Sequence, residues 1–230
     1  MKDERKAAGI RENDTTKVKL IKATQYLLAT YGYEVASTRR IAKLADVTLS
    51  AISFHFETKD NLVHEAVMDA ARRLQRIYSK LTADSKKYLE QPGGTDEETW
   101  KHIDYVISQT MHMTFNPKKS MVNIGLVEHE NGFPPDSQGI ISGVAVDENE
   151  KVLAQLINRL MGGQEMFRAA VIARAVMSAI MSFMEKPLLI NRMEKELKIS
   201  LSDTGAVEKC MHDYFIAGIR TAVEEQKQQK

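Results

Sequence analysis

Apolar side chains recur every three or four residues along most of this chain, which is the spacing that places them on one face of an α-helix. The first such stretch covers residues 17–31 and carries Leu27 and Leu28 on its apolar face. Gly32 follows it, and we expect this glycine to act as a left-handed helix cap. A longer helix is predicted over 59–81. No stretch shows the strict alternation of a half-buried strand, so the pattern predicts an all-α fold.

The second half of the chain is predicted to hold further helices, separated by segments rich in glycine and proline. Helical patterns cover 97–115, 121–130, 136–161, 164–185 and 203–226, whereas 187–198 fits either a short helix or a loop. The predicted breakers are a loop over 84–96, Asn116-Pro117, residues 131–135 and Gly162-Gly163.

Residues 37–62 have the layout of a short helix, a tight turn, a second short helix and the start of a longer one. Ser37 or Thr38 can cap the first short helix, because a hydroxyl accepts hydrogen bonds from free backbone N–H groups. Thr48 can cap the second short helix in the same way, and Thr58 the long one. The apolar residues between the caps have the spacing that lets two short helices pack at a steep angle: Ile41, Ala42, Ala45, Val47 and Ile52. This layout predicts a helix-turn-helix, which places its second short helix in the major groove of DNA.

A wider set of residues supports the same interpretation. The set comprises Ala23, Tyr31-Gly32-Tyr33, Ser37-Thr38, Ile41-Ala42, Ala45, Val47-Thr48, Ile52, Phe54-His55-Phe56, Lys59 and Leu62. With these residues, the run 19–62 resembles the DNA-binding domain of the TetR (tetracycline repressor) family of bacterial transcription regulators. The resemblance implies an N-terminal three-helix DNA-binding domain, here 17–62, and a C-terminal helical bundle for ligand binding and dimerisation, here 63–226. We expect residues 1–16 to be a flexible arm and 227–230 a frayed tail.

Three positions depart from the family pattern. Asp46 stands where glycine is usual, so the turn has to accommodate a side chain, which Asp tolerates better than most residues. Phe54 replaces a frequent tyrosine and cannot make that residue's hydroxyl contact with a phosphate. Arg40 replaces a frequent glutamate, which removes a capping partner and adds a cation near the expected path of the DNA backbone.

The predicted DNA-contacting residues fall into two groups. The base-reading candidates lie on the second short helix and are Thr48, Leu49, Ser50, Ala51 and Ser53. None of them is Arg, Lys, Asn or Gln, so discrimination is expected from hydroxyl bonds, contacts with thymine methyl groups and DNA shape. The predicted phosphate contacts are Thr38, Arg39, Arg40, His55 and Lys59, and Phe54 belongs to the same candidate surface.

Several of these residues also have a purely structural interpretation. Lys59 fits a solvated position at the start of a helix, and His55 fits a packing role between the second short helix and the long one. Phe54 and Phe56 are predicted to lie in the hydrophobic core.

Two late helices are predicted to pair subunits. Small side chains along 164–185 and an apolar stripe along 203–226 would form a four-helix interface across a two-fold axis. The pattern alone is equally compatible with two internal core helices, whereas the family resemblance favours dimerisation. The candidate interface residues are Val171, Arg174, Ala175, Ser178, Ser182, Val207, Met211, Tyr214, Phe215 and Gly218.

A ligand site is expected in the second half of the chain, where ten of the twelve methionines follow residue 110. With nearby aromatic residues they could line an adaptable apolar pocket, or they could be ordinary core. The candidate ligand contacts are Trp100, Tyr105, Met111, His112, Phe115, His129, Phe133 and Met181. Through Asn123-Ile124-Gly125, Glu128-His129-Glu130 and a proline before the long helix, this region also resembles the subgroup with a CecR-type ligand domain.

Composition excludes several other classes of protein. A hydrophobic content of 43% with 27% charged residues fits a globular chain. The net charge of +1 argues against a protein that coats nucleic acid, although residues 1–60 hold 11 Lys or Arg against 8 Asp or Glu. A single cysteine, Cys210, excludes an internal disulfide and suits the cytoplasm. The longest apolar stretch, 171–184, contains Arg174 and is shorter than the ~20 residues of a membrane span, so a buried helix is expected.

Patterns for catalysis or cofactor binding are absent from the sequence. It contains no glycine-rich phosphate loop and no nucleophile motif. Glu128, His129 and Glu130 are adjacent, so on a helix they cannot all face one metal ion. We therefore expect a protein that is not an enzyme and that uses no metal or cofactor.

Together with the resemblance, these features predict a cytoplasmic, ligand-responsive repressor that binds a palindromic double-stranded DNA operator as a homodimer. Its two recognition helices would meet successive major grooves about 34 to 36 Å apart. An unknown small-molecule effector would release the DNA through the long helix that begins at residue 59. The alternative is a helical dimeric module that binds a small molecule or a protein without binding DNA.

Overall fold

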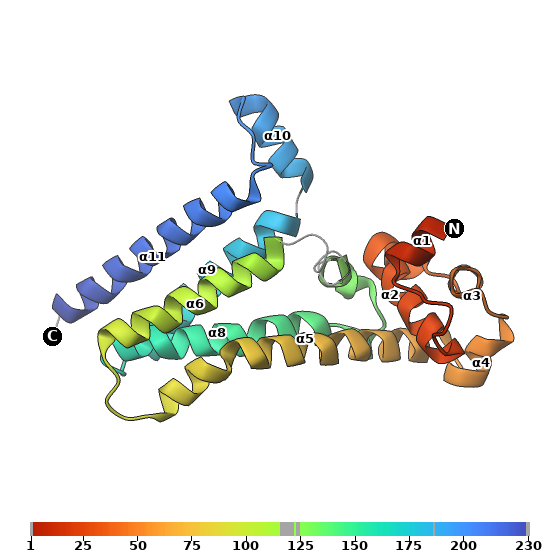
Figure 1. The fold of residues 1–230 in the computed structure, drawn as a ribbon, viewed down its shortest axis with the longest axis horizontal. Helices are drawn as coiled ribbons and strands as arrows, with labels where there is room; N and C mark the ends of the chain where they lie inside the picture. The colour runs from red at the N-terminus through yellow and green to blue at the C-terminus, as the bar shows by residue number, and fades with distance from the viewer. Residues whose placement is uncertain (1, 116–121, 123–124, 186, 229–230) are drawn as a thin grey trace. The chain divides into compact units, whose positions relative to one another are not determined.

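The computed structural model describes residues 2–115, 122, 125–185 and 187–228, and within these ranges it is helical without any β-strand (Figure 1). The predicted all-α fold is therefore confirmed. The chain folds into two compact units. One unit, which we call the head, comprises Met1–Arg76 and Met121–Val144, and the other, the body, comprises Ile77–Ser120 and Ala145–Lys230. The head continues past residue 62, where we placed the domain boundary.

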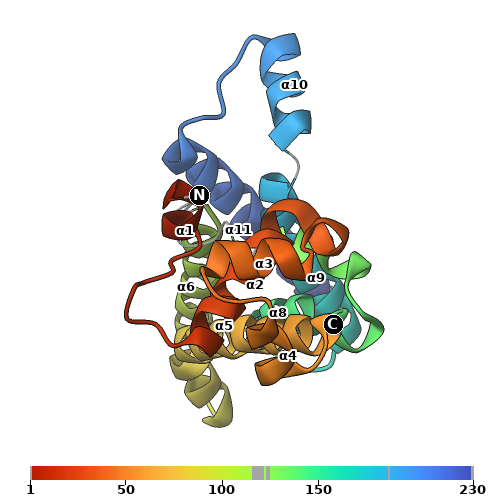
Figure 2. The same ribbon diagram turned by 90° about the vertical axis from the view of Figure 1, so that its right-hand side faces the viewer.

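The head is built mainly from the N-terminal helices (Figure 2). They are α1 (Lys2–Ala7), α2 (Thr16–Val35), α3 (Thr38–Ala45), α4 (Ser50–Phe56) and the first part of α5 (Lys59–Glu90). The later segment of the head contributes helical residues 125–129, the 3₁₀ turns η1 (Glu130–Gly132) and η2 (Pro135–Ser137), and the start of α8 (Ile140–Leu160). The largest fully buried side chains of the head are Leu20, Leu27, Leu28, Ile41, Leu62, Leu126 and Ile141.

Hydroxyl caps open two of the three helices for which we predicted them. Ser37 Oγ accepts from the N–H of Arg40 at 3.3 Å, and Thr58 Oγ1 accepts from the N–H of Asn61 at 3.1 Å. The predicted cap at Thr48 is wrong, because its hydroxyl lies 3.0 Å from Ser50 Oγ and no side chain caps α4. Leu49, which precedes α4, already has right-handed helical dihedrals, whereas a capping residue normally needs an extended backbone.

Gly32 has the positive φ that we expected, but the helix does not end there. Its dihedrals are φ 76° and ψ 178°, and helical structure resumes beyond this kink as far as Val35. A Cβ at this position would lie 3.3 Å from Nδ1 of His129. Glycine therefore serves both the kink and the close packing of the histidine.

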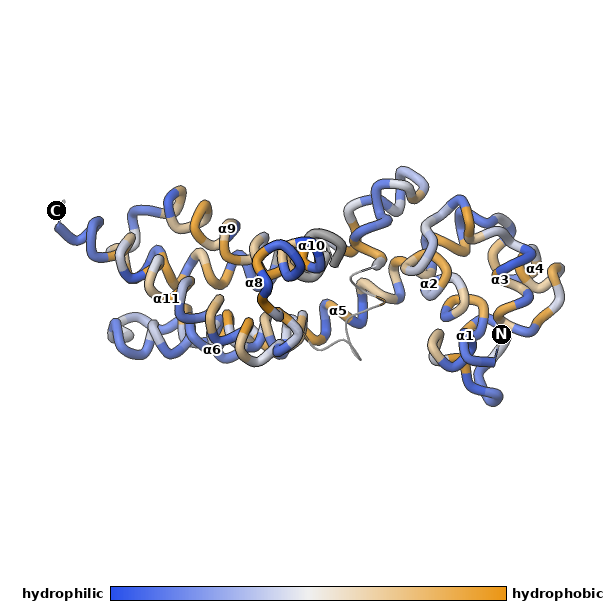
Figure 3. The backbone as a smooth tube through the Cα atoms, turned by 90° about the horizontal axis from the view of Figure 1, so that it is seen from above, coloured by the Kyte–Doolittle hydropathy of each residue, from blue (hydrophilic) through white to orange (hydrophobic). Residues whose placement is uncertain are grey.

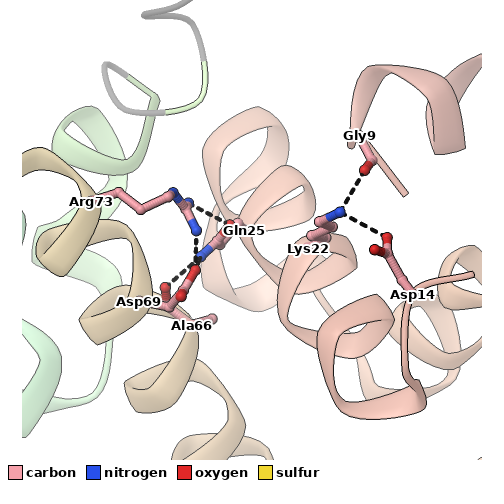
Figure 4. Close-up of polar contacts among 7 residues, drawn as sticks. All are labelled: Gly9, Asp14, Lys22, Gln25, Ala66, Asp69 and Arg73. Carbon is pink, nitrogen blue, oxygen red and sulfur yellow. Dashed lines mark hydrogen bonds and ion pairs between the residues drawn. The ribbon is translucent and has the colours of Figure 1, made fainter. Parts of the chain in front are cut away.

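Polar contacts join the N-terminal segment and α5 to the two sides of α2 (Figure 4). Lys22 Nζ donates to the carbonyl oxygen of Gly9 at 2.9 Å and pairs with Asp14 at 2.7 Å. The segment predicted as a flexible arm thus contains helix α1 and is tied to α2. This ion pair holds the pKa of the Asp14 carboxyl below its usual value, mainly through the hydrogen bond from Lys22.

A buried glutamine links α2 to α5. The amide nitrogen of Gln25 donates to the carbonyl oxygen of Ala66 at 2.8 Å and to Asp69 at 2.9 Å. Arg73 donates to the amide oxygen of Gln25 at 2.9 Å and also pairs with Asp69. Each polar group of the glutamine thus has a partner, which burial requires.

The body contains the rest of α5 and α8, together with α6 (Asp96–Phe115), α9 (Met166–Glu185), α10 (Pro187–Leu197) and α11 (Thr204–Gln228). Its core is formed by apolar residues of these helices, among them Ile103, Ile107, Leu153, Leu156 and Ile180. Figure 1 shows α11, α6 and α8 as neighbouring rods. The α10 segment, left open as helix or loop, is a helix.

The bounds of α5 and α8 differ from the predicted ones. Helix α5 continues to Glu90 instead of ending at 81, because the buried residues Thr82 and Ser85 extend its inward face, and the loop shrinks to residues 91–95. Helix α8 begins at Ile140, not at 136, since η2 and a positive φ of 70° at Gly139 precede it. The predicted breaker Asn116-Pro117 and the start of the helix predicted from 121 lie outside the described residues.

Helix α9 is the most apolar helix of the body (Figure 3). By length and composition alone, Met166–Phe183 is long enough to cross a membrane, a property that core helices of other proteins share. Only 28% of this window is buried within the chain, so the helix that we predicted to be buried is buried on one face only. Much of its apolar surface is therefore available to other molecules.

Gly125→Ala should destabilise the head, because an added Cβ would lie 2.2 Å from the carbonyl oxygen of Ala29 on α2. We expect the free energy of unfolding, measured with urea and circular dichroism, to fall by roughly 1–3 kcal/mol. Gly132→Ala is the matched control, since its Cβ would meet nothing within 4 Å. It should change stability by less than about 0.5 kcal/mol. Equal stability of the two variants would contradict the close approach.

Candidate DNA interface

The turn between α3 and α4 is built around Asp46, which has left-handed helical dihedrals of φ 59° and ψ 53°. The N–H of Val47 donates to the carbonyl oxygen of Ala42 at 3.1 Å, and that of Asp46 to Lys43 at 3.4 Å. These are the two bonds of a Schellman motif, which ends α3 and redirects the chain. The Asp46 carboxylate accepts from Arg5 Nη1 at 2.8 Å. Aspartate therefore takes the place of glycine in this turn by adopting the left-handed conformation that it tolerates.

Helix α4 has one buried face and one exposed face. Ile52 and Phe56 are four residues apart, lie on the same side and are 3% and 4% exposed. Phe54 lies about 200° around the helix from each of them and is 83% exposed, so our prediction that it belongs to the core was wrong. Our core prediction for Phe56 is confirmed.

The base-reading candidates lie on or beside the exposed face of α4. Thr48, Leu49, Ser50 and Ser53 are exposed, and Ala51 is half-buried. A shallow depression of about 560 Å³ runs along this surface, lined by Thr16, Val47, Thr48, Ser50, Ala51, Phe54 and His55. Its lining contains no carboxylate group, so no negative charge in the lining would repel a nucleic acid. Thr16 was missing from our candidates, although its position directly after the cap of α2 marks it as the start of a helix.

The predicted phosphate contacts differ in their exposure and in the contacts that their side chains make within the head. Arg39 is exposed, whereas the guanidinium of Arg40 lies 4.0 Å from the ring centroid of Tyr31. Lys59 is half-buried, and its ammonium donates to the carbonyl oxygen of Tyr33 at 2.8 Å. It also lies 3.5 Å from that tyrosine's ring, and burial lowers its pKa, while nearby acidic residues oppose the shift. Lys59 therefore has a structural role, and it is not the solvated residue that we considered as an alternative. Thr38 is half-buried at the start of α3.

His55 is half-buried between two aromatic rings. Its ring centroid lies 4.9 Å from that of Phe54, edge to face, and 6.1 Å from that of Phe56. It lines both the depression on α4 and a second one of about 360 Å³ that reaches His64 and Asp136. A packing role for this histidine and contact with an approaching molecule are thus compatible.

Tyr33 ties the end of α2 to the start of α5. Its hydroxyl donates to Asp60 Oδ1 at 2.5 Å. This hydrogen bond to a carboxylate, together with burial, raises the pKa of Tyr33 to about 12. This bond and the bond from Lys59 to the Tyr33 carbonyl attach the start of α5 to the end of α2, directly after α4 ends.

The comparison with protein families matches residues 20–66 to the model for bacterial regulatory proteins of the tetR family. The chain carries a TetR-type DNA-binding domain. This match indicates a DNA-binding transcription regulator, and members of the family are typically not enzymes. The matched TetR segment covers α2, α3, α4 and the start of α5. It does not reach the region that resembles the CecR-type ligand domain, and no curated protein matches the chain.

Outside the TetR-type domain, the predicted ligand contacts are divided between the two units. Met111 and Phe115 are buried in the core of the body, and Phe115 packs against Phe183 with ring centroids 5.6 Å apart. Trp100 is half-buried under the guanidinium of Arg220 at 4.6 Å, and Met181 is half-buried. Tyr105 and His112 are exposed on α6, whereas His129 and Phe133 belong to the head. Within the body, Met111 and Phe115 therefore belong to the core, whereas Tyr105 and His112 face away from it.

The predicted interface residues are also of two kinds. Val207 and Phe215 lie in the core of the body, because they share the inward face of α11. Those with exposed side chains or positions are Val171, Arg174, Ala175, Ser178, Ser182, Tyr214 and Gly218, while Met211 is half-buried. Arg174 donates to Glu150 on α8 at 3.2 Å. Phe167, which we had not included, is the most exposed large apolar residue at 85%.

Two groups of polar residues lie outside the exposed face of α4, one in the head and one in the body. Within the described ranges, no group of three or more His, Cys, Asp or Glu side chains could hold a metal ion. Glu128 is exposed, and Glu130 is buried and accepts from the N–H of Ser142, so the two carboxylates diverge. In the body, Asn149 is fully buried and donates to Thr110 at 3.0 Å, but its amide oxygen finds no partner among the described residues. No pattern in the sequence predicts the pairing of Asn149 with Thr110.

The Tyr33–Asp60 bond predicts a loss of stability at alkaline pH. The pKa of Tyr33 is raised, so its contribution is fully present below the ordinary value of 10.0 and is lost as the pH rises through about 12. We expect Tyr33→Phe to lose less stability over this range than the wild type, while keeping the ring beneath Lys59, because only Tyr26 and Tyr78 with their raised pKa values then contribute among the described tyrosines. Urea unfolding at a series of pH values tests this, with Tyr105→Phe as a control for losing a hydroxyl elsewhere. An unchanged pH slope in Tyr33→Phe would contradict the assignment.

Proposed function

We propose that this protein is a homodimeric repressor that binds a palindromic DNA operator through α4 and releases it when a small molecule occupies the body. The observation that carries the proposal is the exposed face of α4 within a TetR-type domain, opposite the packed pair Ile52 and Phe56. A short helix held by such a pair can enter the major groove without losing its own core contacts. Repression and location in the cytoplasm are proposed by analogy with the family.

Dimerisation is supported by the outward faces of α9 and α11. Arg168 at the start of α9 pairs with Glu225 near the end of α11 at 2.7 Å, so the two helices meet within the body. We call the exposed residues Phe167, Val171, Ala175, Ser178, Ser182, Tyr214 and Gly218 the outer α9–α11 face. It combines large apolar side chains with small ones, which suits close helix packing around a two-fold axis.

A response to a ligand is supported by two features of the chain. Asn149 has a buried amide oxygen without a partner among the residues that the structure describes, and such an acceptor costs about 1–3 kcal/mol that a ligand donor would recover. Helix α5 runs unbroken from Lys59 to Glu90, so one rod contributes to both units. We propose that a ligand bound near Asn149 shifts α5, and through it the support of α4. A coupling of about 1–3 kcal/mol would lower operator affinity 5- to 150-fold.

Selection of bound duplexes from random DNA should return a two-fold symmetric sequence, and affinity for it should fall steeply as salt increases. Arg39→Ala removes one exposed cation per subunit, so the slope of log affinity against log salt should become shallower by about 2 in a dimer. Lys195→Ala on α10 is the matched control and should leave the slope unchanged. Failure to bind any duplex at low salt would favour a helical module without DNA binding.

Gly218→Glu should convert the dimer into monomers without unfolding the subunit. A side chain at Gly218 meets nothing within 4 Å in the single chain, but it would intrude into a close contact between copies. Sedimentation equilibrium should show half the wild-type mass, while the circular dichroism spectrum stays helical. Gly143→Glu on α8 is the control, because that position is also open and lies outside the outer α9–α11 face. A dimer that survives Gly218→Glu would contradict this interface.

A further inference from the structure

Part of the lining of the depression on α4 is apolar. Val47 contributes to it from the turn before α4, and Ala51 and Phe54 contribute from α4, where a spacing of three residues places them on one side of the helix. Phe54 is 83% exposed and forms the outer wall of the depression. Because Ile52 and Phe56 hold the opposite side, Phe54 cannot turn inward without dismantling the core of the head.

The polar groups of the same surface have little capacity to read bases. The hydroxyls of Thr48 and Ser50 lie 3.0 Å apart, so one donates to the other and at most one proton is left for a partner. The lining contains neither a guanidinium nor an amide, the groups that bind guanine or adenine in a bidentate manner. Bidentate recognition of guanine or adenine is therefore absent from this lining, and single hydrogen bonds are left to Thr16, His55 and the Thr48–Ser50 pair.

One apolar group is available on the floor of the major groove. Thymine presents its C5-methyl there, and phenylalanine and alanine side chains contact it favourably. The depression is open enough to receive a methyl group and the edge of its base, with a volume of about 560 Å³. The ring of Phe54 stands edge to face against that of His55, and both residues line the depression.

We propose that Phe54, with Val47 and Ala51, is a specificity-determining contact that recognises the C5-methyl of thymine in each half-site. This inference rests on the proposed DNA binding. Phe54 has no hydroxyl group, so it presents only an apolar ring on the exposed face of α4. The same contact accepts 5-methylcytosine, whose methyl group occupies the same place in the major groove.

The experiment compares two versions of a duplex obtained by selection from random DNA. One is amplified with thymidine and the other with deoxyuridine, which lacks only the methyl group. For the full-length protein, we expect the uracil duplex to bind about fourfold more weakly for each methyl contacted, and about 16-fold for two symmetric half-sites. Single-position substitutions then locate the thymine. Replacing that pair by cytosine–guanine should weaken binding, and 5-methylcytosine should restore part of it.

Two variants connect the effect to Phe54. Phe54→Ala should bind both duplexes with nearly equal affinity, because it has no ring to cover the methyl. Phe54→Tyr keeps the ring, so it should retain the thymine preference of the wild type. Phe54 is exposed, and unchanged thermal unfolding would show that both variants fold.

The remaining outcomes separate this inference from the proposed function. If no duplex binds, the proposed function fails, and this inference with it. If the wild type binds both duplexes equally, DNA binding stands and the methyl contact is overturned. A thymine preference that persists in Phe54→Ala overturns the role of Phe54. A change of the oligomeric mass of free Phe54→Ala would show that another copy covers the ring, which also overturns it.

Discussion

The exposed face of α4, with Ser50, Ser53 and Phe54, depends on the packing of Ile52 and Phe56 into the head. These two side chains, one helical turn apart, fix the rotation of α4 about its own axis. Once that rotation is set, Ser53 and Phe54, which lie between them, face solvent. A seven-residue helix is too short to be stable alone, so its exposed face exists only because the opposite face is buried.

The surroundings of α4 reinforce that constraint through polar contacts at each end. The Schellman motif at Asp46 sets the direction in which the chain enters the turn. Tyr33, Lys59 and Asp60 then fix the start of α5, directly after α4 ends. The buried Gln25 joins α2 to the same helix. A small domain with few core residues gains order from such satisfied polar groups.

Periodicity and capping chemistry predicted most of the fold but only part of the candidate site. Leu27, Leu28 and Ile41 follow the helical repeat and are buried, because core burial is what produces that repeat. The error at Phe54 has a different origin, since an aromatic residue is favoured both in a core and at a binding surface. The predicted cap at Thr48 failed because the threonine hydroxyl pairs with Ser50. The pairing of Asn149 with Thr110 joins two helices far apart in sequence, and no local pattern encodes it.

The ion pair between Arg5 and Asp46 lets the start of the chain neutralise a charge at the turn between α3 and α4. Asp46 is the carboxylate of the helix-turn-helix turn, and its side chain is 73% exposed. Left bare, it would repel a polyanion approaching α4; with Arg5 beside it, the local charge is cancelled. A protein trimmed before residue 6 would keep its helix-turn-helix fold and yet present a more negative surface. A truncation or tag that displaces Arg5 would therefore change the charge that this turn presents.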